Sequence, residues 1–456
     1  MLKARNYKRN RFVAAEEREF AVREYDYTKL LDAGFLDYGI ERNPIVERHN
    51  KARERRDIYM AIDARLQTGL QNAMADAVAA DPRLKGKPRL RASVVVLDAE
   101  KGDLLCSANY PLPDQDSIHT LNDRKIYGAV PFEKLKNHAP VTERDLGLTF
   151  QTQPGSTAKV MSAMAGFMKF GDKAAGITYD IKGEETIEGP AIEPWGKVSM
   201  ETAIVKSSNC YFINLVHDRQ LYPELDSIYS TVGIRVNPDD YIAKGDETPY
   251  FFNQDEFKRR REFDNLMTKL GNSAVNKYSV YRTDRARGNY KKMNFGETLA
   301  AWGQGPVLAS PLNMARVASI VANSGRFTPT RYILREGDKD MPVMPSKKVI
   351  SGTSADKLKL FMQKESDKHR RNGHAFPAGD GDLRMGGKTG TPERAYRKSK
   401  PNDAWYMFFI ESETAGGPLA VAVRLERTES LTSGKAVDFV SKVVIPALND
   451  AGYNVR

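Results

Sequence analysis

The most informative segment of this chain is Gln153–Lys159, which reads Gln-Pro-Gly-Ser-Thr-Ala-Lys. A Pro-Gly pair interrupts regular structure, so a new element is expected to begin behind it. Ser156 then opens a run whose apolar residues recur at helical spacing: Val160, Met161, Met164, Phe167 and Met168. The pattern predicts a buried helix with Ser156 in its first turn.

Lys159 follows Ser156 by one helical turn, so the two side chains can meet. A serine hydroxyl is inert at neutral pH unless a base removes its proton, and desolvation lowers the pKa of a lysine enough for that task. The N–H groups at a helix N-terminus also favour developing negative charge. The pair therefore suits a nucleophile, although a helix cap is the plain alternative for Ser156. The same spacing recurs at Ser354–Lys357, which we interpret as an ordinary N-cap followed by a solvated lysine.

The composition of the 456 residues, 41% apolar and 28% charged, predicts a soluble chain with a sizeable core. No run approaches the roughly eighteen apolar residues of a membrane span. Met1 leads into basic residues without the apolar region of a signal peptide. We therefore expect a cytoplasmic protein, or a piece of a secreted protein that lacks its leader.

The net charge of +11 favours anionic partners in general. However, acidic residues flank the basic runs Arg53–Arg56 and Lys258–Arg261, and no nucleic-acid motif is present, so we expect no nucleic-acid partner. Cys106 and Cys210 lie in apolar stretches, which favours two buried thiols over one disulfide. The histidines are scattered without metal-ligand spacing, so we expect neither a metal nor a cofactor.

Residues 1–57 are highly charged with scattered apolar anchors, and we interpret them as an arm or the remnant of a larger N-terminal region. The main body is expected over residues 58–456. It begins with a short strand and a helix capped by Asp63, in which apolar residues recur every fourth position. A hairpin follows, because apolar runs at 93–97 and 104–108 flank turn residues. Residues 235–295 form a polar insert.

Two further motifs follow the Ser156 helix. Ser207 and Asn209 lie in the turn between two predicted helices, where such residues ordinarily cap and stabilise the turn. Gly303–Gly305 leads to a helix start at Ser310–Pro311, and no strand or third glycine frames it as a nucleotide fingerprint.

The last motif lies in the glycine-rich segment Arg384–Thr391. Its glycines would let another backbone approach closely, as at a strand edge beside a bound peptide. Lys388, Thr389 and Thr391 supply one cation and two hydroxyls, which suit a substrate carboxylate. The remaining predicted elements are a helix over 354–365, strands over 405–410 and 419–425, and a helix over 435–449.

The ordered set of Ser-x-x-Lys at Ser156, Ser-x-Asn at Ser207 and Lys-Thr-Gly at Lys388 resembles the transpeptidase domain of high-molecular-mass penicillin-binding proteins, in the serine penicillin-recognising superfamily. The resemblance covers about residues 58–450 and implies a mixed α+β fold of the penicillin-binding transpeptidase or β-lactamase type. That fold has an antiparallel sheet flanked by helices, an all-helical lobe, and the active site between them. Similar stretches also occur at Ile62–Gln67, Val95–Leu105, Gly303–Gly305, Pro311–Leu312 and Ala404–Trp405.

The resemblance also implies roles for the residues of these motifs. Ser156 would attack the penultimate D-alanine carbonyl of a peptidoglycan stem peptide, with Lys159 as its base. Ser207 would relay the proton toward the leaving D-alanine, and Asn209 would hold the substrate amide and Lys159.

The same resemblance places the substrate carboxylate at the last motif. Lys388 would steer that carboxylate and tune Ser207, while Thr389, Gly390 and Thr391 would bind it. The backbone N–H groups of Ser156 and Thr391 would form the oxyanion hole. The acyl-enzyme would pass to a neighbouring stem, and β-lactams would trap it.

Members of this family work outside the cytoplasmic membrane, in the periplasm, usually behind an N-terminal anchor. We expect this chain to lack that anchor and much of its N-terminal pedestal. The expected partners are stem peptides, β-lactam antibiotics and a membrane glycan polymerase or other cell-wall synthesis proteins. The expected cellular role is in cell shape or cell division.

Two alternatives stay open. A D,D-carboxypeptidase or β-lactamase-type hydrolase would use the same serine but needs a group that activates water for deacylation. A non-catalytic penicillin-binding interaction or sensor module would keep the fold and bind a partner through the N-terminal arm or the insert.

Overall fold

The computed structural model describes the greater part of the chain outside its N-terminal arm and its polar insert. Of the predicted arm it describes only 5–6 and 11–12, and the predicted insert lies outside the described residues from 237 onward. The described residues are 5–6, 11–12, 58–80, 90–110, 146–148, 152–181, 195–236, 301–304, 307–378, 384–392, 402–412, 414, 417–427 and 431–455.

The chain forms two compact units, and the smaller one contains Met1–Met60, Asp116–Ile126 and Ile333–Pro342. The guanidinium of Arg335 lies 3.7 Å from the ring centroid of Tyr59 in this unit, at cation–π distance. The predicted boundary between residues 57 and 58 stays a prediction. The described strands of the smaller unit are antiparallel. β1 (Arg5–Asn6) pairs with β2 (Arg11–Phe12). A three-stranded sheet has β11 (Ile333–Glu336) between β12 (Lys339–Asp340) and β3 (Ile58–Met60).

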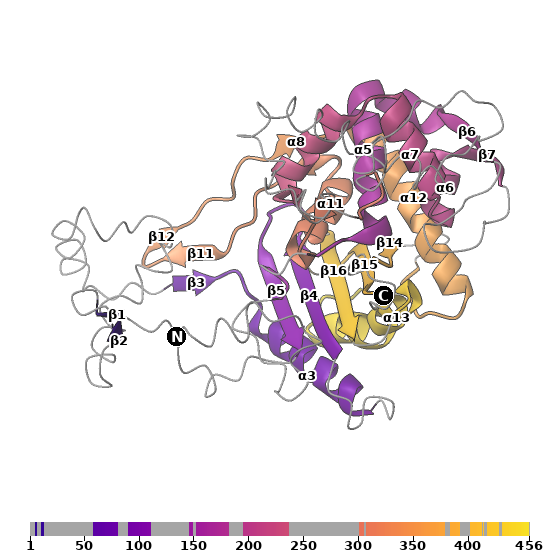
Figure 1. The fold of residues 1–456 in the computed structure, drawn as a ribbon. Helices are drawn as coiled ribbons and strands as arrows, with labels where there is room; N and C mark the ends of the chain where they lie inside the picture. Colours follow the sequence, from indigo (N-terminus) through magenta and orange to yellow (C-terminus); the bar gives the residue numbers. More distant parts are fainter. Residues whose placement is uncertain are drawn as a thin grey trace. The chain divides into compact units, whose positions relative to one another are not determined.

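The larger unit is built on a five-stranded antiparallel sheet with the strand order β14-β15-β16-β4-β5 (Figure 1). Among the strands of this sheet, β4 comes first in the chain and β16 comes last, and these two strands pair with each other. The predicted hairpin and the predicted strands are confirmed. The strands are β4 (Leu90–Asp98), β5 (Leu104–Tyr110), β14 (Met385–Gly390), β15 (Ala404–Ile410) and β16 (Leu419–Arg427).

Alternation along the strands divides the core into two layers, one on each face of the sheet. On β16, Leu419, Val421 and Val423 enter one layer, whereas Ala420 and Ala422 enter the other. Successive strand residues point to opposite faces, so a strand buried on both faces is apolar at nearly every position. Full burial of one such large side chain stabilises the fold by about 2 kcal/mol.

The first and last helices of the unit cover one face together. The predicted cap is confirmed, because the carboxylate of Asp63 accepts hydrogen bonds from the N–H groups of Arg65 and Leu66 at 2.9 and 3.1 Å. Its other oxygen accepts from the Tyr453 hydroxyl at 2.8 Å, which ties the two ends of the unit. The predicted C-terminal helix contains a π-helical turn. The elements on this face are α3 (Ala64–Ala80), α13 (Ser433–Phe439), η8 (Val440–Val444) and α14 (Ile445–Asp450).

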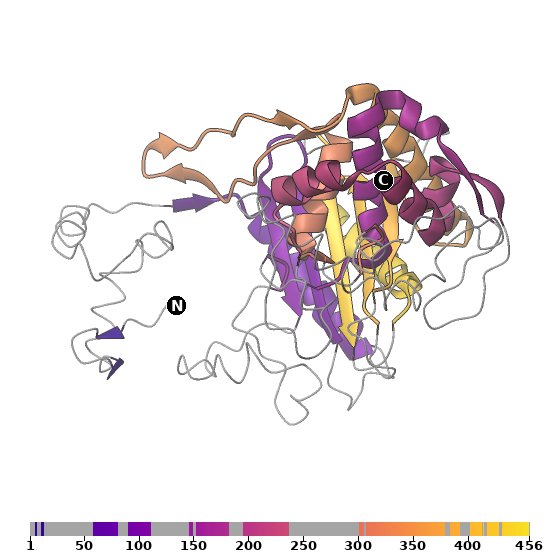
Figure 2. The ribbon, with the colours of Figure 1, turned by 45° about the horizontal axis from the view of Figure 1, so that its top comes forward.

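A helical lobe covers the other face, with α11 lying on the strands and α12 along β14 (Figures 1 and 2). The predicted helices near Ser156, before Ser207, after Asn209 and from Pro311 are all present. The helices are η2 (Gly155–Ala158), α5 (Lys159–Phe170), η3 (Gly171–Gly176), α6 (Met200–Lys206), α7 (Asn209–Asp218), α8 (Tyr222–Val232), α11 (Pro311–Ala322) and α12 (Gly352–Arg371). The minor strands are β6 (Thr178–Ile181) with β7 (Gly196–Ser199), β8 (Arg235–Val236) with β9 (Val307–Leu308), and β10 (Arg326–Phe327) with β13 (Lys347–Lys348).

Two helix predictions need correction. The helix expected over 354–365 runs from Gly352 to Arg371, and its N-cap is Ser351, whose hydroxyl accepts from the N–H of Ser354 at 3.1 Å. The helix α8 was not predicted at all, although a proline in its first turn and Gly233 at its C-cap are ordinary start and stop signals.

Both cysteines are buried and neither forms a disulfide, as predicted. None of the helices in the described part of the chain combines the length and the hydropathy that crossing a lipid bilayer requires.

Candidate active site

Ser156 lies in the short helix η2, one turn before the long helix α5. The hydroxyl of Thr157 donates to the carbonyl of Pro154 at 2.7 Å and closes this first turn. Ser156 is partly exposed, whereas its neighbours from Gly155 to Val160 are buried. Lys159 begins α5 and is completely buried. The turn therefore leaves its serine partly exposed and keeps its lysine in the protein interior.

Glycines let the Ser156 turn lie directly against the end of β14. Gly155 has a φ of 57°, a conformation that side chains other than glycine rarely adopt. A Cβ on Gly390 would lie 2.7 Å from the carbonyl oxygen of Pro154, so only glycine fits there. The N–H of Gly155 also donates to the carbonyl of Gly303 at 2.9 Å. The contact with Pro154 places the Ser156 turn beside the end of β14, and Thr391 directly follows Gly390.

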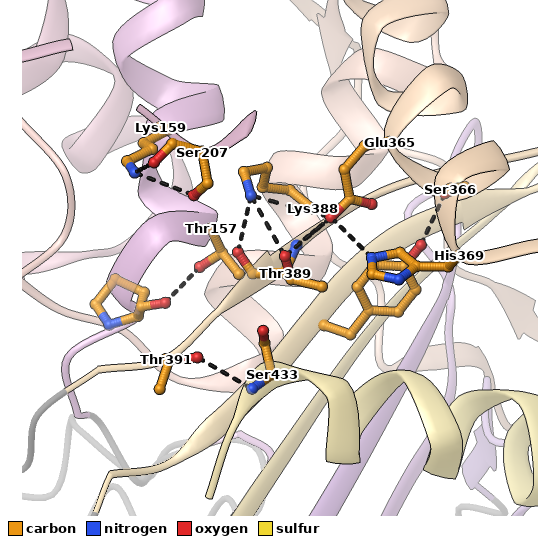
Figure 3. Close-up of polar contacts among 12 residues, drawn as sticks. Thr157, Lys159, Ser207, Glu365, Ser366, His369, Lys388, Thr389, Thr391 and Ser433 are labelled. Carbon is orange, nitrogen blue, oxygen red and sulfur yellow. Dashed lines mark hydrogen bonds and ion pairs between the residues drawn. The ribbon is translucent and has the colours of Figure 1, made fainter. Parts of the chain in front are cut away.

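Lys159 and Ser207, which are far apart in the sequence, meet in the structure. The Lys159 Nζ donates to the Ser207 hydroxyl at 3.1 Å and to the Ser207 carbonyl oxygen. Ser207 is the C-cap of α6 and has a φ of 62°, which costs on the order of 1 kcal/mol for a residue with a Cβ. This left-handed turn directs both oxygens of Ser207 toward the lysine (Figure 3).

The capping of the turn is done by a different residue from those expected. The hydroxyl of Ser208 accepts from the N–H of Tyr211 at 3.1 Å, and this cap starts α7. Ser207 is therefore available to Lys159. Asn209 is the first residue of α7 and is partly exposed beside Ser207.

Lys388 lies in the middle of the site on β14 and is completely buried. Its Nζ donates to the carbonyl of Thr389 at 3.2 Å and to the Thr389 hydroxyl at 3.4 Å. Burial lowers the pKa of Lys388 to about 8, while the nearby carboxylate of Glu365 raises it and Lys368 lowers it. The carboxylate oxygen Oε1 of Glu365 lies 4.0 Å from the ammonium nitrogen.

Glu365 of α12 was not predicted as a site residue. Its Oε1 accepts from the N–H of Thr389 at 3.1 Å, from the Thr389 hydroxyl at 2.9 Å and from His369 Nε2 at 3.3 Å (Figure 3). Burial alone would raise the pKa of Glu365, but His369, Lys388 and Thr389 together hold it below its ordinary value. A signal was present in the sequence, because Glu365 falls on the buried face of its helix with Leu358 and Phe361.

The two threonines of the last motif have different surroundings. The Thr391 hydroxyl accepts from the N–H of Ser433 at 3.0 Å, so its own hydrogen is left to donate. The Thr389 hydroxyl instead donates to Glu365. The roles of both residues in carboxylate binding stay predictions.

Two of the motif's glycines serve the sheet itself. A Cβ on Gly386 would lie 2.4 Å from the Phe409 ring, and one on Gly387 would lie 2.5 Å from the Tyr406 ring. The close approach expected of a bound peptide is thus made at these positions by aromatic side chains of β15. Among the described residues, no group of three His, Cys, Asp or Glu side chains is placed to hold a metal ion.

The family model of the penicillin binding protein transpeptidase domain matches residues 92–444, well over half of the chain. The chain therefore belongs to this family, a class of penicillin-binding serine acyl transferases. A search of curated proteins found no match.

Solved structures with the same fold include several penicillin-binding proteins. Pseudomonas aeruginosa PBP2 in complex with WCK 5153 is 21% identical, with 88% of this chain and 80% of that chain covered and a TM-score of 0.56. The penicillin G acyl-enzyme complex of penicillin-binding protein A from M. tuberculosis is 19% identical, with 98% and 91% covered and a TM-score of 0.55. A peptidoglycan synthase complex that coordinates polymerization and crosslinking is 21% identical, with 87% and 62% covered and a TM-score of 0.55. The predicted fold class is confirmed.

Proposed function

We propose that this chain is a peptidoglycan D,D-transpeptidase that cross-links stem peptides through an acyl-enzyme on Ser156. The observation that carries the proposal is the contact of the buried Lys159 Nζ with Ser207, one turn from the partly exposed Ser156. A base held in the interior, a second hydroxyl and an accessible nucleophile are the parts that serine acyl transfer requires.

In the acylation step, the Ser156 hydroxyl attacks the carbonyl carbon of the penultimate D-alanine, and its proton passes to neutral Lys159. The C–N bond to the terminal D-alanine then breaks, and the proton travels through Ser207 to the leaving amine. The N–H groups of Ser156 and Thr391 bind the developing oxyanion, because Gly390 and Gly155 hold these two backbone segments in contact. The products are an ester on Ser156 and free D-alanine.

Substrate orientation depends on charge at the other side of the site. Lys388 and the Thr391 hydroxyl attract the terminal carboxylate, and Asn209 holds the substrate amide. In the second step, the amine of a neighbouring stem peptide attacks the ester and regenerates the Ser156 hydroxyl. A β-lactam forms the same ester, but its opened ring stays attached and blocks the second step.

Intact-protein mass spectrometry after incubation with benzylpenicillin tests the proposal. We expect one stable adduct on the peptide that contains Ser156, and no adduct in Ser156→Ala. Absence of an adduct with the drug unchanged would contradict the nucleophile, and would favour the interaction module. Absence of an adduct with the drug hydrolysed would favour a β-lactamase-type hydrolase.

A second assay separates transfer from hydrolysis. We expect the chain to release D-alanine from a stem-peptide analogue and to join the acyl group to an added acceptor amine. Release of D-alanine without the joined product, at any acceptor concentration, would identify a D,D-carboxypeptidase instead.

Partners and location follow from the same proposal. The stem peptides lie outside the cytoplasmic membrane, so we place the chain there. The likeness to a synthase complex that combines polymerization with crosslinking supports a membrane glycan polymerase as partner. Co-purification of the full-length protein with a glycan polymerase from membranes would test it, and purification of the protein alone would count against the partner.

A further inference from the structure

We propose that Glu365 is a positioning residue of this site: its carboxylate fixes Thr389 and keeps Lys388 cationic, so that Thr391, and not Thr389, donates its hydroxyl hydrogen to the substrate carboxylate. The inference rests on the proposed function, since it assigns the hydroxyl and the cation that bind the substrate.

One carboxylate oxygen of Glu365 binds three donors. Oε1 of Glu365 accepts from the backbone and the side chain of Thr389 and from His369, at 3.1, 2.9 and 3.3 Å. Glu365 is only 2% exposed, so these donors and Lys388 take the place of water at Oε1, whereas the buried Oε2 has no hydrogen-bond partner among the described residues. The helix α12 thereby holds the edge strand β14 at the residues of the Lys-Thr-Gly motif.

The hydrogen bond between Thr389 and Glu365 has only one possible direction. An ionised carboxylate has no hydrogen to donate, so the Thr389 hydroxyl must be the donor to Glu365. Its oxygen lies 3.4 Å from the Nζ of Lys388, which donates to it. The Thr389 hydroxyl is thus occupied on both sides by protein groups, whereas the Thr391 hydroxyl accepts from Ser433 and keeps its hydrogen.

Several ionisable side chains surround the ammonium group of Lys388. Glu365 and Lys368 of α12 both act on it, and His369 binds the carboxylate of Glu365. The hydroxyl of Tyr406 on β15 is hydrogen-bonded to Ser366, the residue after Glu365. Burial and Lys368 lower the pKa of Lys388, and Glu365 opposes them. Without the carboxylate the ammonium would lose its proton at lower pH.

The pH dependence of acylation tests this role. We would measure the acylation rate with a fluorescent penicillin from about pH 6 to about pH 10 for wild type and Glu365→Gln. In wild type we expect the rate to fall as Lys388 loses its proton at about pH 8. In Glu365→Gln the fall should begin about one pH unit or more lower, which makes the variant about fivefold slower or more at the wild-type midpoint.

Matched variants separate positioning from folding. Glu411→Gln removes a carboxylate that pairs with Lys359 on the outside of the same helix at 3.0 Å, and should leave the profile unchanged. Glu365→Asp keeps the negative charge, so its acylation rate should fall at a pH nearer to that of wild type, even if its absolute rate is lower. If the acylation rate of Glu365→Gln falls at the same pH as that of wild type, and acylation still depends on Ser156, the role of Glu365 is overturned but the proposed function is not. A wild-type chain without Ser156-dependent acylation would overturn the proposed function, and this role with it.

A second measurement decides the matter if Glu365→Gln does not fold. Benzylpenicillin and its methyl ester differ only at the carboxylate, so the ratio of their acylation rates reports how well the site binds that group. We expect Thr391→Val to reduce this ratio about tenfold or more, and Thr389→Val to slow both probes by a similar factor. A loss of discrimination in Thr389→Val that equals the loss in Thr391→Val would overturn the inference.

Discussion

The pattern Ser-x-x-Lys occurs twice in this chain, and the structure treats the two copies in opposite ways. At Ser156 the serine is partly exposed and the lysine is completely buried. At Ser354 the serine is completely buried, and Lys357 is 42% exposed at its side chain. A serine and a lysine one turn apart form a reactive pair only where the fold exposes the first and desolvates the second.

The hydrogen-bond partners follow the same contrast. Lys159 donates to Ser207, which holds its nitrogen inside the site. The Ser354 hydroxyl instead donates to Asp172 at 2.6 Å, and Lys357 lies 3.7 Å from the same carboxylate. The second copy is therefore a link between α12 and the segment after α5, although Ser351 and not Ser354 caps the helix.

The largest effect on the acylation rate should come from replacing the lysine of the first Ser-x-x-Lys copy. We expect Lys159→Met to slow acylation by benzylpenicillin by about 10³-fold, because the Ser156 proton loses its acceptor. Lys357→Met should acylate at the wild-type rate. Acylation of Lys159→Met at more than about a tenth of the wild-type rate would remove Lys159 from the proposed mechanism.

The burial of Lys388 should also make the free energy of unfolding depend on pH. Lys388 has a pKa of about 8 in the folded chain and about 10.4 when unfolded. Between these values the unfolded state binds more protons, so stability rises with pH from about 8 to about 10, by up to about 3 kcal/mol from this group.

Urea unfolding across that range checks the sign. Wild type should gain stability relative to Lys388→Met as the pH rises through this range. A parallel course of wild type and Lys388→Met would mean that Lys388 keeps an ordinary pKa.

A smaller effect on rate is expected at Ser207. We expect both Ser207→Ala and Ser207→Gly to slow acylation by about 100-fold, because the relay hydroxyl is lost in each. Ser207→Gly should be the more stable of the two by about 1 kcal/mol, since glycine tolerates the φ of 62°. Equal stability in thermal denaturation would argue against strain at this turn.

The smallest effect should be at Ser354. We expect Ser354→Ala to lower the Tm by about 1 to 3 °C, because a buried hydrogen bond is lost, and to leave acylation unchanged. Ser156→Ala should show the reverse, with an unchanged Tm and no acylation. A slower acylation in Ser354→Ala would show that the second copy also supports the site.

Most of the fold could be predicted because its elements are marked locally. The hairpin follows from apolar runs around turn residues, and Asp63 and Ser310 mark helix starts by their capping hydrogen bonds. The helix α8 and the full length of α12 were missed. The second half of α12 is strongly charged, and its helical state depends on contacts that periodicity does not reveal.

The candidate site was predicted in part for the same reason. Ser156, Lys159, Ser207 and Lys388 stand in short motifs, and the structure brings Lys159 to Ser207 and Gly390 to the Ser156 turn. Glu365 stands in no motif. A charged residue on the buried face of a helix was the one signal, and its partner could not be read from the sequence.

Most of the helices and strands, the alternation that buries both faces of the sheet and the order of the three motifs can be predicted from the sequence alone. The three-dimensional contacts, by contrast, show which Ser-x-x-Lys pair has a buried lysine, that Ser208 caps α7 while Ser207 contacts Lys159, and that Glu365 binds Thr389. The physical reason is distance along the chain. Secondary structure depends on neighbours within about one or two turns, whereas burial and hydrogen-bond partners here join residues 24 to 182 positions apart.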